Sequence, residues 1–172
     1  MKNFDTERLS ISEFTTADAA FILELLNTSS WLQFVGDRGV KNIDDAVKYI
    51  NDKYIESYKK NGFGLYKIAL KNETPIGMCG LIKRDTLDNI DIGFALLPVY
   101  EGKGYGYEAA SIILKHAKNV LRIKRIVAIT TKTNINSITL LKKLDLKFEK
   151  LIRMEGDEEE LMLFGTSDAM DH

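Results

Sequence analysis

The sequence has few of the features that mark secreted, membrane-bound or multidomain proteins. Its single cysteine, Cys79, cannot form an intramolecular disulfide, and no apolar run approaches the roughly 20 residues that span a bilayer. The first eight residues carry charge and contain no apolar signal core. Only two prolines occur, and no repeat or Pro/Gly/Ser-rich linker divides the chain. We therefore expect a cytoplasmic protein that forms a single domain over residues 1–172.

An excess of one charge is also missing. The 24 basic and 25 acidic residues give a formal net charge of -1, whereas a dedicated nucleic-acid binder usually has a basic excess. Two histidines and one cysteine provide no metal-ligand spacing. The sequence thus argues against nucleic acid, a membrane or a metal as partners, and it is compatible with a monomer or a homodimer. The composition that is present, 45% hydrophobic and 28% charged, is ordinary for a globular protein.

Hydrophobic periodicity predicts alternating strands and helices. Alternation indicates a first strand over residues 8–14, and a capping box at Thr15–Asp18 precedes a helix to about residue 27. Residues 28–41 are expected to be a loop, after which Asn42 caps a second helix that ends at Asn61-Gly62. The remaining predicted elements are strands at 64–70, 75–83 and 90–97, a helix at about 104–121, a strand at 125–131, a helix from Asn134 or Asn136 to about Leu144, and strands at 148–154 and 160–164.

The predicted order is β-αα-βββ-α-β-α-ββ, with about seven strands and four helices. Short polar links join the three middle strands, which indicates antiparallel hairpins. The strands at 90–97 and 125–131 are connected through a helix, so we expect them to be parallel neighbours. The fold class is therefore α/β (α+β), with a mixed, mostly antiparallel sheet and helices on its faces.

The strongest chemical signal is a glycine-rich turn. A predicted strand runs into Gly102-Lys103-Gly104-Tyr105-Gly106 and then into a helix. The first amides of a helix lack internal acceptors and lie at the positive end of its dipole, so they favour an anion such as phosphate. Lys103 adds a positive charge. A P-loop would need Ser or Thr after the lysine, and a Rossmann fingerprint would need another glycine spacing and a βαβ unit.

This segment resembles motif A of the GNAT superfamily of N-acetyltransferases, which reads (Gln/Arg)-x-x-Gly-x-(Gly/Ala). Gly104 and Gly106 match the motif, whereas Glu101 departs from its first position. The Gly-Lys-Gly-Tyr sequence followed by Glu108-Ala109, and Thr6-Glu7-Arg8-Leu9 near the start, are similar to the subgroup of ribosomal-protein N-terminal acetyltransferases.

A second block supports this resemblance. Asn134-Ile-Asn-Ser137, followed by the segment 140–146, is similar to the subgroup's Asn-x-x-Ser…Leu-Glu-Lys-Leu-Gly-Phe. Two positions depart from that pattern: Lys142 replaces Glu, and Asp145-Leu146 replaces Gly-Phe. Together the two blocks extend the resemblance over nearly the whole chain, and they imply a GNAT-like sheet and acetyl-CoA as co-substrate.

The resemblance also implies how coenzyme A is held. Main-chain groups on the central strand would pair with the pantetheine arm, as an added strand does. Amides of the glycine-rich turn would hold the diphosphate, and two polar side chains of the next helix would reach the coenzyme. The implied coenzyme-binding residues are Phe94, Ala95, Leu96, Gly102, Lys103, Gly104, Tyr105, Gly106, Tyr107, Asn134 and Ser137.

Family members transfer the acetyl group by direct attack of a neutral amine on the thioester, without a covalent enzyme intermediate. A base must remove the proton of the amine, and the leaving thiolate needs a proton. Leu141 stands where many members have a tyrosine acid, so Ser137 is the candidate acid. Asp91, on the central strand, is the candidate base, with Glu101 and Asp37 as rivals. An ordinary structural role is the competing interpretation for both Asp91 and Ser137.

Trp31, Asp37 and Arg38 are candidate acceptor-side residues, because they lie in the loop before the second helix, and this loop borders the acceptor site in the family that the sequence resembles. The expected acceptor is a primary amine on a protein N-terminus or on a small molecule. The missing tyrosine supports one alternative function, a non-catalytic acetyl-CoA-binding sensor or structural module.

Overall fold

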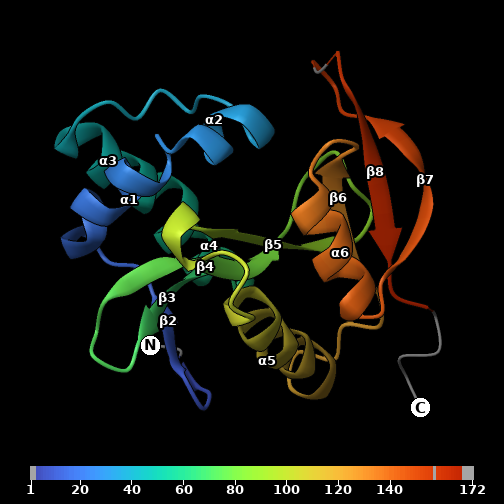
Figure 1. The fold of residues 1–172 in the computed structure, drawn as a ribbon, viewed down its shortest axis with the longest axis horizontal. Coiled ribbons are helices and arrows are strands. Elements are labelled where there is room, and N and C mark those ends of the chain that lie inside the picture. Colours follow the sequence, from blue (N-terminus) through green and yellow to red (C-terminus); the bar gives the residue numbers. More distant parts are fainter. Residues whose placement is uncertain (1–2, 157, 168–172) are drawn as a thin grey trace.

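The computed structural model describes residues 3–156 and 158–167 (Figure 1). Within these residues the strands form one eight-stranded sheet of order β1-β2-β3-β4-β5-β6-β8-β7. Neighbouring strands are antiparallel throughout, apart from the parallel pair β5 and β6. The strands are β1 (Asn3–Asp5), β2 (Leu9–Glu13), β3 (Leu65–Leu70), β4 (Pro75–Ile82), β5 (Ile90–Leu96), β6 (Ile126–Thr131), β7 (Lys147–Arg153) and β8 (Glu160–Gly165).

Helices cover both faces of this sheet (Figure 1). On one face, α1 and α3 bury Ile22 and Ala46 against Met78 of β4. On the other face, α5 and α6 bury Ile113 and Leu141 in a second core cluster with residues of the central strands. A π-helical segment, Ile50–Ile55, joins α3 to α4 without a break. The helices are α1 (Ala19–Leu25), α2 (Ser29–Phe34), α3 (Ile43–Tyr49), α4 (Glu56–Asn61), α5 (Tyr105–Asn119) and α6 (Ile135–Lys143).

The sheet opens between β5 and β6, and this opening determines where a ligand can enter. The two strands pair only at Ile90↔Ile126 and Asp91↔Val127. Beyond these pairs β5 stays paired with β4 to Leu96, and β6 stays paired with β8 to Thr131. Each strand therefore leaves one edge without a strand partner within the described residues. Because the two strands are parallel, both free edges lie toward their C-terminal ends.

Local capping explains why several predicted helices begin and end as expected. In the capping box, the amide of Thr15 donates to Asp18 Oδ2 at 2.9 Å. Asn42 Oδ1 accepts from the amide of Asp45 at 2.8 Å, and Gly62 ends the second helix with a left-handed φ of 77°. The antiparallel hairpins of β3, β4 and β5 and the parallel β5–β6 pair are likewise confirmed.

Two predictions about the N-terminal third were wrong. The expected loop at 28–41 contains the short helix α2, which Thr28 caps by accepting from the amide of Trp31 at 3.2 Å. Trp31 is buried, so tertiary packing stabilises a helix that has no sequence periodicity of its own. The described sheet also has one strand more than predicted, because residues 3–5 pair with β2 and bury Phe4.

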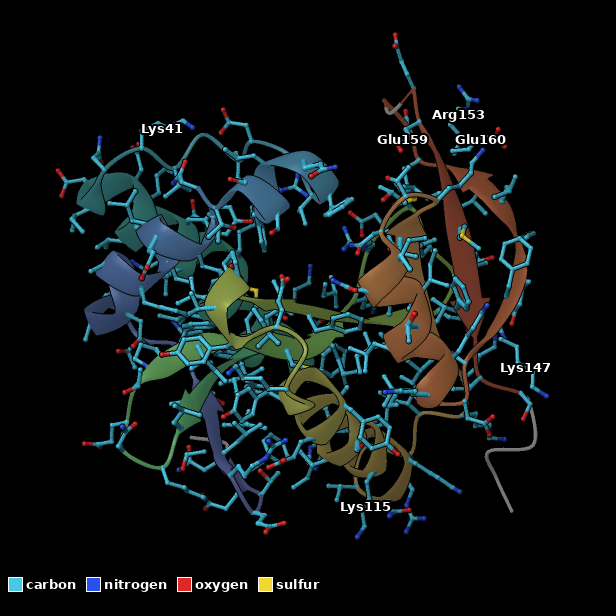
Figure 2. All side chains as sticks on the ribbon, in the orientation of Figure 1. Lys41, Lys115, Lys147, Arg153, Glu159 and Glu160 are labelled. Atoms are coloured by element: carbon cyan, nitrogen blue, oxygen red, sulfur yellow. The ribbon has the colours of Figure 1, made fainter. Side chains whose placement is uncertain are left out.

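The exterior and the interior differ sharply in polarity. Charged side chains such as Lys41, Lys115, Lys147 and Arg153 lie on the outside of the molecule (Figure 2). Cys79 is fully buried, and burial raises the pKa of its thiol to about 12, so it is not a nucleophile at neutral pH. Within residues 3–156 and 158–167, none of the helices combines the length and the apolar character that a membrane span requires.

Candidate active site

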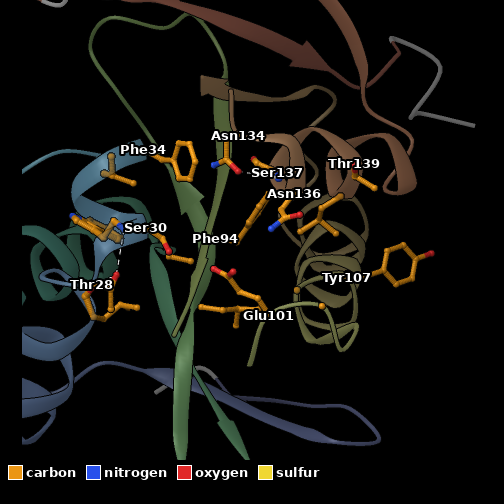
Figure 3. Close-up of a pocket in the computed structure, with 18 of the residues that line it drawn as sticks. Thr28, Ser30, Phe34, Phe94, Glu101, Tyr107, Asn134, Asn136, Ser137 and Thr139 are labelled. Atoms are coloured by element: carbon orange, nitrogen blue, oxygen red, sulfur yellow. Dashed lines mark hydrogen bonds between the residues drawn. The ribbon is translucent and has the colours of Figure 1, made fainter. Parts of the chain in front are cut away.

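A pocket of about 370 Å³ lies where β5 and β6 separate (Figure 3). Helix α2 and the end of α1 line one side, α6 and its N-cap line another, and β5 with the glycine-rich turn lies between them. The lining residues are Leu25, Thr28, Ser30, Trp31, Phe34, Val35, Phe94, Ala95, Leu96, Glu101, Gly102, Gly104, Gly106, Tyr107, Asn134, Asn136, Ser137, Thr139, Leu140 and Lys143.

The glycine-rich turn forms the wall at the start of α5. Gly102 and Gly104 have φ angles of 75° and 84°, a left-handed conformation that side chains disfavour. Gly104 is also the residue immediately before the 15-residue helix α5, whose first amides have no acceptor within the helix. No main-chain carbonyl in the described chain accepts from the amides of residues 102–104. These N–H groups are therefore available to an anion at the positive end of the helix dipole.

The strand β5 adds an open main-chain edge. Phe94, Ala95 and Leu96 line the pocket beyond Asp91, the last residue of β5 that pairs with β6. Their opposite edge is occupied, because β4 pairs with β5 through these positions. An extended ligand chain of suitable width can form hydrogen bonds with the free edge in the way that an added strand does.

The start of α6 brings polar side chains to the same pocket. Asn134 is the N-cap of α6, and its Oδ1 accepts from the amide of Ser137 at 3.2 Å. Ser137 is half-buried, and its neighbour Asn136 also lines the pocket. Leu141, at the position of the family tyrosine, instead lies fully buried in the core. Ser137 and Thr139 are therefore the hydroxyl-bearing residues of α6 that line the pocket.

Asp91 is held away from these residues. It is 1% exposed and does not line the pocket. Its Oδ1 accepts from Nε of Arg84 at 3.1 Å. Burial raises the pKa of Asp91 to about 6, although the charge and hydrogen bond of Arg84 oppose that rise. The structure thus brings Asp91 together with Arg84 and does not bring it together with Ser137.

This buried carboxyl should make stability depend on pH. A folded-state pKa of about 6, above the ordinary 3.8, means that the stabilising protonated form is fully present below pH 3.8 and is lost as the pH rises through 6. The difference corresponds to about 3 kcal/mol. Relative to the Asp91→Asn variant, the wild type should lose about this much free energy of unfolding between pH 4 and pH 7, as measured by urea denaturation. Asp88→Asn, an exposed change in the β4–β5 connection, should show the same pH dependence of the free energy of unfolding as the wild type. If Asp91→Asn also shows that dependence, the raised pKa of Asp91 is not its cause.

The acceptor-side residues predicted from the sequence separate into two groups. Trp31 lines the pocket, whereas Asp37 and Arg38 are exposed and do not line it. Asp37 binds within its own loop, where it accepts from the amide of Gly39 at 2.8 Å and pairs with Lys41 at 3.0 Å. The indole N–H of Trp31 is buried and has no acceptor within the described residues. It is therefore a donor that a bound group with an acceptor atom can satisfy.

The residues predicted from the sequence and the residues that line the pocket overlap only in part. Lys103 and Tyr105 belong to the glycine-rich turn but do not line the pocket, whereas the rival base Glu101 does. Sequence reasoning missed Thr28 and Ser30, whose positions depend on α2. The signal for them was the run Thr-Ser-Ser before Trp31, which is typical of a helix start but was interpreted as a loop. Leu25, Val35, Asn136, Thr139, Leu140 and Lys143 were also not singled out as lining residues.

Comparison with known proteins identifies the family of this chain. Residues 8–147 match the acetyltransferase (GNAT) domain. The chain belongs to the GNAT acetyltransferase family. This GNAT chain is 28% identical over 145 residues to the uncharacterized N-acetyltransferase YnaD of Bacillus subtilis, covering 84% of the chain and 82% of that relative.

Solved structures share the fold of this GNAT chain. The ribosomal-protein-S5-alanine acetyltransferase of Vibrio fischeri superimposes with a TM-score of 0.82 at 19% identity, covering 98% of each chain. RimL, a ribosomal L7/L12 α-N-protein acetyltransferase in complex with coenzyme A, superimposes with a TM-score of 0.83 at 16% identity, covering 98% of this chain and 99% of that one. In the described part of the GNAT chain, no cluster of His, Cys, Asp and Glu could hold a metal ion.

Proposed function

We propose that this GNAT chain transfers the acetyl group of acetyl-CoA to a primary amine in the pocket between β5 and β6. The observation that carries the proposal is that three separate sequence segments line one pocket: the glycine-rich turn, the free edge of β5 and the start of α6. The related N-acetyltransferase of Bacillus subtilis and the coenzyme A complex of RimL support the choice of reaction and co-substrate.

The chain's own groups fit coenzyme A along its length. The amides from Gly102 to Tyr107 suit the diphosphate, because they combine unpaired N–H groups with the positive end of the α5 dipole. The main chain of residues 94–96 suits the amide groups of the pantetheine arm. Asn134 and Ser137 approach from the other side of the pocket. Gly104 has no side chain to obstruct this approach; a Cβ there would lie 3.2 Å from Nη2 of Arg8.

Acetyl-CoA supplies an activated thioester carbonyl. In the proposed reaction the amine nitrogen bonds to the carbonyl carbon and the C–S bond breaks. A protonated amine and the thioester thus yield an amide, a thiol and one released proton. A main-chain amide near Ala95 or Leu96, on the β5 edge, would stabilise the negative charge that develops on the carbonyl oxygen.

Two side chains of the pocket are proposed to move the protons. Ser137 would donate to the leaving thiolate, because its hydroxyl lies on the α6 turn that lines the pocket. Glu101 would take the proton of the amine, since it is the pocket-lining member of the three carboxylates considered as bases, whereas Asp91 is paired with Arg84 and Asp37 with Lys41. Glu101 and Ser30 both belong to the lining of the pocket and are labelled in Figure 3.

Release of free thiol from acetyl-CoA, measured with a panel of peptide N-termini, polyamines and amine antibiotics, tests this proposal. We expect one acceptor class to release thiol in proportion to acetylated amine. Glu101→Gln should lower that turnover without changing the affinity for coenzyme A. Thermal stabilisation by acetyl-CoA without thiol release from any amine would instead indicate a coenzyme-binding sensor. No stabilisation at all would contradict the coenzyme site.

A further inference from the structure

Outside the pocket lining, Arg8 and Glu108 connect the hairpin of β1 and β2 to the glycine-rich turn. Glu108 lies in the first turn of α5. Its Oε2 accepts from Oγ1 of Thr6 at 2.5 Å and from the amide of Arg8 at 2.9 Å, and its Oε1 accepts from Nε of Arg8 at 2.7 Å. One carboxylate is thus held by three donors, which fixes the position of the Arg8 side chain relative to the start of α5.

The Arg8 guanidinium then contacts the residues on both sides of Gly104. Its Nη1 donates to the carbonyl oxygen of Lys103 at 3.0 Å. Its Cζ lies 4.4 Å from the centre of the Tyr105 ring, which is within the range of a cation–π interaction. Gly104, between these two residues, has the left-handed φ of 84°. A single arginine therefore contacts both neighbours of this left-handed glycine.

The direction of the Gly104 N–H follows from peptide geometry. The carbonyl of Lys103 and the N–H of Gly104 belong to the same planar trans peptide, in which they point in opposite directions. Because Arg8 binds that carbonyl, the N–H of Gly104 points away from Arg8, and Gly104 itself lines the pocket. We propose that Arg8, held by Glu108, is a positioning residue that aims the Gly104 amide at the diphosphate of the coenzyme.

This inference rests on the proposed function. A positioning role of Arg8 differs from a purely structural role in one measurable way. If the contacts only stabilise the fold, their loss should weaken every ligand of the pocket equally. If they aim the Gly104 amide, their loss should weaken only ligands that carry a diphosphate. Coenzyme A and pantetheine provide this comparison, because pantetheine has the same thiol arm and lacks the diphosphate.

We expect Arg8→Lys to reduce the preference for coenzyme A over pantetheine by about tenfold, the equivalent of one lost charge-assisted hydrogen bond. Lysine keeps the charge but loses the planar fork that binds Glu108 and the Lys103 carbonyl together. Glu108→Gln should show the same change. Dissociation constants from titration calorimetry give the preference, and the amide resonance of Gly104 should shift less on coenzyme A binding in both variants than in the wild type.

Arg125→Lys is the matched control. Arg125 also forms a two-point pair with a glutamate, Glu149, at 2.7 and 2.5 Å, and it binds the Thr166 carbonyl at 3.0 Å. It does not line the pocket between β5 and β6, so its replacement should leave the preference unchanged.

Each outcome of this experiment has a distinct meaning. An unchanged preference in Arg8→Lys and Glu108→Gln, or an equal loss for both ligands, would overturn the positioning role. If the wild type itself shows no preference for coenzyme A over pantetheine, the diphosphate site of the proposed function fails instead. Melting temperatures identify a variant that does not fold, and Thr6→Val, which removes one donor to Glu108, then takes its place under the same criteria.

Discussion

Replacing Gly104 with aspartate should weaken coenzyme A binding by at least about 100-fold, or about 2.7 kcal/mol. The left-handed φ of 84° becomes strained once a side chain is present, and the new Cβ would lie 3.2 Å from Nη2 of Arg8. The added carboxylate would also lie beside amides that otherwise favour the diphosphate, and like charges repel. Titration calorimetry with coenzyme A measures the loss.

Gly62→Asp provides the control for backbone strain. Gly62 has a similar φ of 77°, a Cβ there would meet nothing within 4 Å, and the residue does not line the pocket. This variant should lose some thermal stability and keep its affinity for coenzyme A. Wild-type affinity in Gly104→Asp would show that the glycine-rich turn does not hold the coenzyme.

Replacing Ser137 with alanine should lower turnover about 100-fold and leave the affinity for coenzyme A nearly unchanged. A hydroxyl that donates to the leaving thiolate acts in the transition state, so its loss is expected in kcat rather than in binding. The start of α6 should survive, because the Asn134 side chain binds the main-chain amide of residue 137 and not its hydroxyl. Steady-state kinetics with the acceptor identified by thiol release provide the measurement.

Ser111→Ala makes the same change on α5, at a residue that does not line the pocket, and should retain wild-type kinetics. A wild-type turnover number in Ser137→Ala would remove Ser137 from the mechanism. A rise in the dissociation constant without a change in turnover would assign Ser137 to coenzyme binding alone.

The elements that were predicted well are those with strong local signals. The capping box at Thr15–Asp18, the cap at Asn42 and the left-handed Gly62 each depend on hydrogen bonds or dihedral angles within a few residues. The hairpins of β3, β4 and β5 depend on short connections. The helix α2 and the strand β1 were missed because each is short and is stabilised by burying Trp31 or Phe4 against distant parts of the chain.

The candidate site could be predicted in part. The glycine-rich turn, residues 94–96 and the pair Asn134 and Ser137 were all named from motifs, and apart from Lys103 and Tyr105 they line one pocket. The carboxylate that acts as the base was harder to predict. A sequence pattern does not show that Asp91 pairs with Arg84 while Glu101 lines the pocket. The contact between Arg8 and Glu108 could not be predicted from the sequence either, although both residues belong to segments that resemble the family.

Local features of this GNAT chain can be predicted from its amino-acid sequence: where helices begin, which glycine positions can be left-handed, and which segment presents unpaired amides. These features follow from interactions between near neighbours, so their signals are contained in short stretches of residues. Three other features became known from the three-dimensional fold: β5 and β6 separate after Asp91 and Val127, β8 lies between β6 and β7, and Arg8 reaches the glycine-rich turn. Those outcomes depend on strand register and on packing between distant segments, for which no short run of residues contains the information.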